Sequence, residues 1–215
     1  MLELMGDFFA RRLEGYDAHM LRDIRGAEEF YPAAAALLPD APGCRVLDLG
    51  CGTGLELEAY FPRNPTARVT GIDLSGEMLA ALRRKFPDRD LTLIRGSYLE
   101  LSLGEAEYDA AISVESLHHF PREAKLGLYR RLHEALTPGG YFVLADYFAS
   151  DDEEEAALFR ELRELRRKEG LSEDTLVHFD TPLTPAHELE LLREAGFAPQ
   201  LLQSWGATSL VLARR

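Results

Sequence analysis

Cysteine and long apolar runs are both scarce in this sequence, and each scarcity excludes a class of protein. Cys44 and Cys51 stand at the two ends of an expected strand, so their Cα atoms should lie about 20 Å apart, too far for a disulfide. No run of 18 apolar residues occurs, so we expect no membrane span. The N-terminal Met1–Leu4 has no basic region typical of a secretion signal. Free thiols without such a signal indicate a cytoplasmic protein.

Basic residues are outnumbered, because 24 Lys and Arg face 37 Asp and Glu, for a net charge of −13. A surface of this sign repels phosphate groups, so we expect no nucleic-acid partner and no membrane partner. The short basic clusters Arg11-Arg12 and Arg166–Lys168 are interpreted as solvated helix faces. The 215 residues suit one domain, and a homodimer is left open.

Short apolar runs alternate with helical patterns, which predicts a doubly wound α/β fold with a mostly parallel sheet. Two further strands near the C-terminus are joined by a short glycine-containing link, which suits an antiparallel hairpin. The expected strands are 45–49, 67–73, 91–94, 109–114, 141–145, 199–205 and 208–213.

Helix signals fill the intervals between these strands. Ser75 should cap a helix over 76–86, and the helix over 121–136 should stop at Pro138-Gly139-Gly140. An acidic first turn and a basic last turn predict a helix over 151–170, and Thr184 with Pro185 begins another that ends before Gly196. Residues before 40 read as helices interrupted at Gly15, Gly26 and Pro32.

These signals divide the single domain into four parts. We expect a helical cap at 1–40, a ligand-binding core at 41–150, a helical insertion at 151–184, and a final helix and hairpin at 185–215. The cap and the insertion break the strand–helix alternation, which favours a lid over the active site.

The most informative segment is Val46–Gly54, with the sequence VLDLGCGTG. A strand runs into three glycines at every second position and then into a helix. Glycines let backbone approach a ligand closely, and open α/β sheets bind ligands at the carboxyl ends of their strands. A dinucleotide site would need a small residue where Leu55 stands, so the spacing disfavours NAD. Asp73 ends the next strand, where a carboxylate can bind the two hydroxyls of a ribose.

Successive segments of the chain resemble the motifs of class I S-adenosylmethionine (SAM) dependent methyltransferases of the small-molecule type. The matching segments are 46–54, 69–73, 108–113, 136–141 and, near the end, 191–197. The resemblance implies SAM as cofactor, S-adenosyl-L-homocysteine as product, and a seven-stranded sheet of order 3-2-1-4-5-7-6 with strand 7 antiparallel.

The resemblance also implies roles for individual residues. The bend from Gly50 through Cys51 and Gly52 to Gly54 would lie against the methionine part of SAM, supported by Asp48. Asp73 would hold the ribose. Adenine would be lined by Leu74, Met78, Ser97 and Tyr98; many members have Asp where this chain has Ser97, which implies a weaker contact with the adenine amino group.

Methyl transfer needs a general base only if the acceptor must lose a proton. Candidates follow the fourth and fifth expected strands, and of Glu115, His118, His119, Asp146 and Tyr147 we select His118 and Glu115 as catalytic residues. Glu115 would also face the cofactor. Adjacent histidines lack a third ligand nearby in sequence, so we expect no metal.

Four aromatic or histidine residues of the expected lid are further candidates. Tyr16 is expected at the cofactor, where its ring could stabilise a sulfonium; His19 and Tyr31 could also meet the ligands, and His178 is expected to pack structurally.

Three readings of function follow. The first is methyl transfer to a small-molecule acceptor. The second is an enzyme that makes a SAM derivative, which would need an anion-binding arginine that the sequence alone does not place. The third is a SAM-binding scaffold without catalysis.

Overall fold

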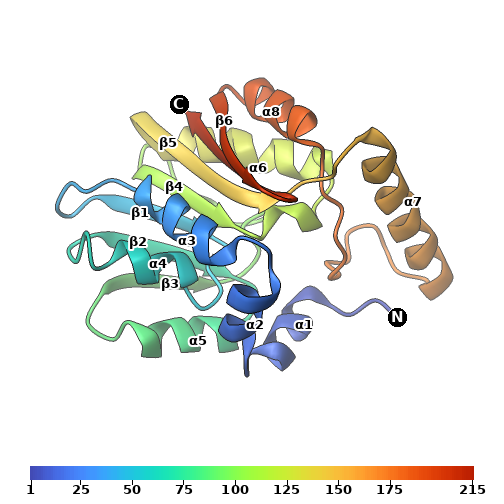
Figure 1. Ribbon diagram of the computed structural model, residues 1–215, viewed down its shortest axis with the longest axis horizontal. Coiled ribbons are helices and arrows are strands. Elements are labelled where there is room, and N and C mark those ends of the chain that lie inside the picture. Colours follow the sequence, from blue (N-terminus) through green and yellow to red (C-terminus); the bar gives the residue numbers. More distant parts are fainter.

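A seven-stranded sheet organises the computed structural model of the protein, which describes residues 1–215 (Figure 1). Its strand order is β3-β2-β1-β4-β5-β7-β6, and β7 runs antiparallel to both β5 and β6. The predicted fold class and strand order are therefore confirmed. The strands are β1 (Arg45–Leu49), β2 (Arg68–Asp73), β3 (Asp90–Arg95), β4 (Tyr108–Val114), β5 (Leu136–Tyr147), β6 (Ala198–Trp205) and β7 (Thr208–Arg214).

The central strands are buried on both faces, which is why they read as continuous apolar runs. Val46 belongs to one apolar cluster, whereas its neighbour Leu47 belongs to the other, because successive side chains point to opposite faces. Helices α3 (Ala27–Ala36), α4 (Leu55–Tyr60) and α5 (Gly76–Lys85) supply the first cluster. Helices α6 (Arg122–Ala135) and α8 (Pro185–Glu194) cover the opposite face (Figure 1).

The predicted helix caps form. The Ser75 hydroxyl accepts a hydrogen bond from Met78 N at 3.2 Å, and the Thr184 hydroxyl accepts one from His187 N at 3.4 Å. Asp151 caps α7 (Asp152–Glu169), which ends at Gly170 in the left-handed conformation. Only Leu162 of α7 is buried, and the helix projects from the body of the protein (Figure 1).

One predicted helix interruption and one predicted break in the chain are wrong. Pro32 lies inside α3 and does not interrupt it, because the carbonyl that loses its partner belongs to Glu28, which is exposed to water. Helix α6 ends at Ala135, within one residue of the predicted end, but Pro138-Gly139-Gly140 is no break, because it lies within β5. The carbonyls of Glu134 and Ala135 accept hydrogen bonds from the backbone of residues 106 and 107, so the helix is capped early.

Helices α1 (Met5–Arg12) and α2 (Tyr16–Asp23) lie at the carboxyl edge of the sheet, whereas α3 packs on its face. The first residues pair with the segment before α8: Met5 N donates to Leu176 O, and His178 N donates to Glu3 O, both at 3.0 Å. The expected cap and insertion are thus joined by backbone hydrogen bonds across more than 170 residues of sequence.

Cys44 and Cys51 are both free and buried. None of the helices combines the length and the apolar character that crossing a membrane requires.

Candidate functional site

The glycine bend after β1 adopts a backbone that side chains disfavour. Gly50, Gly52 and Gly54 have φ of +73°, +48° and +75°. A Cβ at Gly50 would lie 2.1 Å from the Ser116 hydroxyl oxygen, so glycine is required there by contact as well as by conformation. A Cβ at Gly52 would meet nothing closer than 4.0 Å, which shows that the bend borders open space.

Asp73 lies beside this bend at the end of β2. Its Oδ2 accepts a hydrogen bond from Gly52 N at 2.9 Å, and its Oδ1 accepts one from Ser75 N at 2.8 Å. Burial raises the pKa of this carboxyl, while the two backbone donors oppose that shift. Each oxygen keeps a lone pair that could accept a further hydrogen bond from a ligand.

A narrow pocket of about 40 Å³ adjoins the bend, and we call it the bend pocket. Eight of the residues predicted to bind cofactor line it: Tyr16, Gly50, Gly52, Asp73, Leu74, Met78, Tyr98 and Glu115. Sequence reasoning missed Met5, Phe9 and Ser116, and it placed His119 only among the candidate bases. The α1 residues carry no motif, and only the fold brings them to this edge.

Four other predicted cofactor residues do not line the bend pocket. Asp48 and Cys51 are buried beneath the bend, with Cys51 Sγ packed where Gly71 has no side chain. Gly54 packs against Leu82, and the hydroxyl of Ser97 accepts a hydrogen bond from Leu99 N at 3.2 Å. These positions support the bend and the turn after β3 from below.

Asp48 and Glu56 form a buried carboxyl pair under the bend. Asp48 Oδ2 and Glu56 Oε1 are buried, and no donor group reaches either oxygen. Burial raises the pKa of Asp48 well above its usual range and raises that of Glu56 to about 7. A proton shared between the two carboxyls supplies the missing donor at neutral pH.

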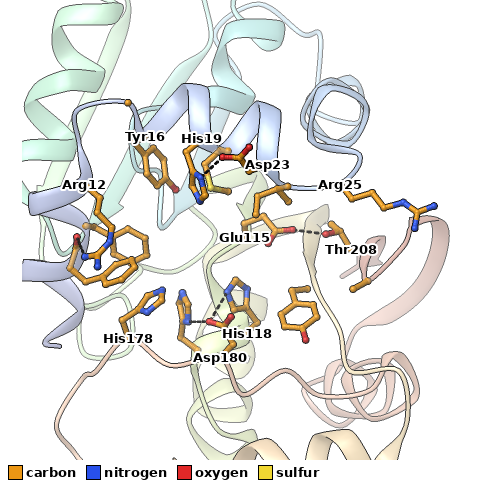
Figure 2. Close-up of a pocket in the computed structure, with 18 of the residues that line it drawn as sticks. Arg12, Tyr16, His19, Asp23, Arg25, Glu115, His118, His178, Asp180 and Thr208 are labelled. Atoms are coloured by element: carbon orange, nitrogen blue, oxygen red, sulfur yellow. Dashed lines mark hydrogen bonds and ion pairs between the residues drawn. The ribbon is translucent and has the colours of Figure 1, made fainter. Parts of the chain in front are cut away.

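A larger cavity of about 860 Å³ opens beside the bend pocket, and we call it the large cavity (Figure 2). Its walls come from α1 and α2, the turn after β4, the segment before α8, and the β6–β7 hairpin. Figure 2 shows His118, Asp180 and His178 on one wall and Tyr16, His19 and Asp23 on the facing wall. The two cavities share four lining residues: Phe9, Tyr16, Glu115 and His119.

His118 is held by Asp146 at the end of β5. The Nδ1 atom lies 2.5 Å from Asp146 Oδ1, and Asp146 Oδ2 accepts a hydrogen bond from Leu117 N at 2.9 Å. Burial lowers the pKa of His118, but the charge and hydrogen bond of Asp146 outweigh it and raise the pKa to about 9. These contacts favour the protonated form of this imidazole.

Glu115 follows β4 with φ of +49°, an uncommon conformation for a residue with a side chain. Its Oε1 accepts a hydrogen bond from the Thr208 hydroxyl at 2.9 Å (Figure 2). Burial is the main cause that raises the pKa of Glu115, to about 7. This carboxyl faces both cavities and can exchange a proton near neutral pH.

The lid candidates separate into two groups. Tyr16 and His19 line the large cavity as anticipated, whereas Tyr31 is buried in the core against Phe30. His178 packs with its ring stacked on Phe8 at 3.5 Å between centroids, as predicted, and it also lines the large cavity. The pairing of residues 3–5 with 176–178 brings it there.

Three arginines also reach the large cavity, and the sequence alone did not predict their position. Arg11, Arg12 and Arg25 line it. Arg12 pairs with Glu3 at 3.1 Å and lies over the Phe8 ring, whereas Arg25 is in none of the ion pairs of the structure.

Comparisons with known proteins agree with this geometry. A protein family described as "Methyltransferase domain" matches residues 46–140. The O-methyltransferase cnsE of Penicillium expansum is 30% identical over 165 residues, or 74% of this chain and 54% of that protein. The trans-aconitate 2-methyltransferase of Deinococcus radiodurans is 33% identical over 183 residues, or 83% of this chain and 67% of that protein. The chain therefore spans only about half to two thirds of these relatives' lengths.

A solved SAM-dependent methyltransferase from Mesorhizobium loti has the same fold, with a TM-score of 0.64 at 27% identity over 86% of this chain and 96% of that one. The strand order, the glycine bend and the carboxylate beside it agree with these similarities. The chain belongs to the class I SAM-dependent methyltransferases.

Proposed function

We propose that the protein transfers a methyl group from SAM to a small-molecule acceptor bound in the large cavity. One observation carries this proposal: the bend pocket and the large cavity share the side chains of Tyr16, Glu115 and His119. Ligands in the two cavities would therefore lie next to each other, as group transfer requires.

The residues around the bend fit the cofactor that the family uses. The Asp73 oxygens have free lone pairs for two ribose hydroxyls, and Gly52 leaves open the space that a Cβ would fill. Leu74 and Met78 offer an apolar surface to an adenine ring. A pocket of about 40 Å³ is too small for an adenosyl group, so Met5 and Phe9 must move outward as it enters.

Bound SAM supplies a methyl group on a sulfonium, which an acceptor displaces in line. The protein's part is to align the two ligands and to exclude water. Tyr16 presents its ring at the boundary between the cavities, where it would stabilise positive charge. Phe9 and Met5 keep water from the reacting atoms.

Of the two predicted catalytic residues, Glu115 is the better proton acceptor. Its pKa of about 7 leaves a large deprotonated fraction at neutral pH, and its carboxyl faces both cavities. His118 is less suited to that role, because Asp146 outweighs the effect of burial, raises its pKa to about 9 and favours the protonated imidazole.

We also propose a lid over both cavities, formed by residues 1–24 together with residues 171–184. Backbone hydrogen bonds join these segments to each other, so they would move together. The remaining cap helix, α3, packs on the sheet and stays with the core. We keep the proposed core at 41–150, insertion at 151–184 and final part at 185–215, and we assign α3 of the expected 1–40 cap to the core. Free cysteines support a cytoplasmic location.

A second candidate, an enzyme that makes a SAM derivative with an anionic substrate, is favoured by one observation. Arg25 lines the large cavity and forms no ion pair there. The same arginine suits a carboxylate acceptor for methyl transfer, such as the one named for the D. radiodurans relative.

Incubation with SAM labelled in its methyl group and pools of small acids, phenols and amines tests the proposal. Methyl transfer predicts label in an acceptor product, with S-adenosyl-L-homocysteine formed in equal amount. A SAM derivative would instead retain the label on the nucleoside. Tight SAM binding with no turnover in any pool would favour the scaffold reading.

A further inference from the structure

Two adjacent histidines and an aspartate converge on one wall of the large cavity. His118 and His119 lie in the short 3₁₀ turn after β4, and Asp180 lies in the segment before α8. One ligand atom from each residue lies within 4.8 Å of the other two. Thr181 N donates a hydrogen bond to His118 O at 2.8 Å, which fixes Asp180 beside the histidines.

Two of these ligand atoms lack partners. His119 Nδ1 and Asp180 Oδ1 are both buried and lie 3.1 Å apart, and neither atom meets the geometry of a hydrogen bond. Asp180 Oδ1 also lies 3.6 Å from His118 Nε2, so three possible ligand atoms converge there. The His119 side chain is only 4% exposed. A buried polar atom without a hydrogen bond costs about 1–3 kcal/mol, so the convergence of these atoms on one point favours a bound cation there.

The third ligand atom is oriented by a carboxylate behind it. His118 Nδ1 lies 2.5 Å from Asp146 Oδ1, which leaves Nε2 directed toward Asp180 at 3.6 Å (Figure 2). Asp146 is itself buried and held by backbone donors at 2.9 and 3.0 Å. Histidine ligands of metals usually have this arrangement, with the second nitrogen donating to a carboxylate.

We propose that His118 Nε2, His119 Nδ1 and Asp180 Oδ1 bind one divalent transition-metal ion of the Zn²⁺ type. Two imidazoles and one carboxylate suit such an ion and are a poor set for Mg²⁺ or Ca²⁺, which prefer oxygen ligands. The competing group of Glu115, His118 and Asp146 would use the nitrogen already bonded to Asp146, so it is disfavoured.

This site narrows the acceptor class, an extension that rests on the proposed methyl transfer. Three protein ligands leave at least one coordination position, and it faces the large cavity. A hydroxyl or carboxylate oxygen of the acceptor would occupy it. Transfer would then form an oxygen–carbon bond and break the carbon–sulfur bond, with the electron pair left on sulfur. The proton of a hydroxyl acceptor would pass to Glu115.

Calorimetric titration of untagged, chelator-treated full-length protein with ZnCl₂ tests the site without reference to activity. We expect one ion per chain, and at least about tenfold weaker binding in D180N and in H119Q. The variant H133Q makes the same His-to-Gln change on α6, far from the site, and should bind like the wild type. Absorption of the Co²⁺-loaded protein should show tetrahedral bands that D180N loses.

Two outcomes would overturn the metal site: no stoichiometric binding by the wild type, or equal binding by the wild type, D180N and H119Q. Circular dichroism establishes that each variant is folded. If D180N does not fold, the comparison between H119Q and the wild type still tests the site. SAM titration of the same samples separates the two proposals, because a wild-type protein that binds SAM but no Zn²⁺ would reject only the metal.

Discussion

Asp73 and Gly52 are joined by a 2.9 Å hydrogen bond from the glycine amide to the carboxylate Oδ2. This contact ties the end of β2 to the bend after β1, and it places an acid where a ribose would lie. The bend cannot relax without moving Asp73, so the shape of the bend pocket depends on both residues.

Replacing Asp73 with Asn should weaken SAM binding by about 10- to 100-fold, because hydrogen bonds to a charged acceptor contribute about 1.5–3 kcal/mol. Calorimetry measures the affinity. The matched variant D88N changes an exposed aspartate outside both cavities and should bind SAM like the wild type. Equal affinity in D73N would remove Asp73 from the site.

Replacing Gly50 with Ala should destabilise the protein more than the same change at Gly139. Both glycines have positive φ, which costs alanine about 1–2 kcal/mol. Nothing lies within 4 Å of a Cβ at Gly139, whereas one at Gly50 would collide with Ser116, which adds about 1–3 kcal/mol. Urea unfolding compares the two variants, and equal losses would show that the predicted collision is absent.

Replacing Glu115 with Gln should lower turnover by about 10²- to 10⁴-fold on an acceptor that must lose a proton, with SAM affinity nearly unchanged. The amide keeps the size of the side chain and its contact with Thr208 but cannot take up a proton. Thr208→Val removes that contact alone and should have a smaller effect. Full activity of E115Q would exclude Glu115 as the base.

The carboxyl pair of Asp48 and Glu56 predicts that stability falls as pH rises. Burial raises both pKa values, that of Glu56 from 4.5 to about 7, so the folded protein binds more protons than the unfolded chain between these values. The free energy of unfolding should therefore decrease between about pH 4.5 and 7, by an amount on the order of 2 kcal/mol.

The variant E56Q should flatten this dependence, since the amide donates to Asp48 without a titratable proton. Urea unfolding at several pH values measures it, with E100Q, an exposed glutamate outside the pair, as the matched control. An unchanged slope in E56Q would mean that other groups cause the dependence.

The sheet could be predicted from sequence because its signals are local. Each central strand is a continuous apolar run, and Ser75 and Thr184 cap their helices with neighbouring residues. The predicted interruption at Pro32 was wrong, because the free-energy cost of proline in a helix depends on whether water reaches the carbonyl one turn earlier. That exposure depends on tertiary structure and not on local sequence.

The candidate site divides in the same way. The bend and Asp73 are close in sequence and carry a motif, so they were found. Asp180 and His178 reach the histidines after β4 only because the chain returns from α7. These residues are about 60 positions apart in the sequence, and no sequence motif predicts a contact over that separation. Met5 and Phe9 likewise enter the bend pocket through pairing of the N-terminus with residues 176–178.

The central claim is that the bend after β1 and Asp73 hold an adenosyl cofactor. Calorimetric titration of the wild-type protein with S-adenosyl-L-homocysteine, and separately with NAD, tests it most directly. The account predicts one S-adenosyl-L-homocysteine per chain and no measurable affinity for NAD. No binding of S-adenosyl-L-homocysteine, or tighter binding of NAD, would contradict it.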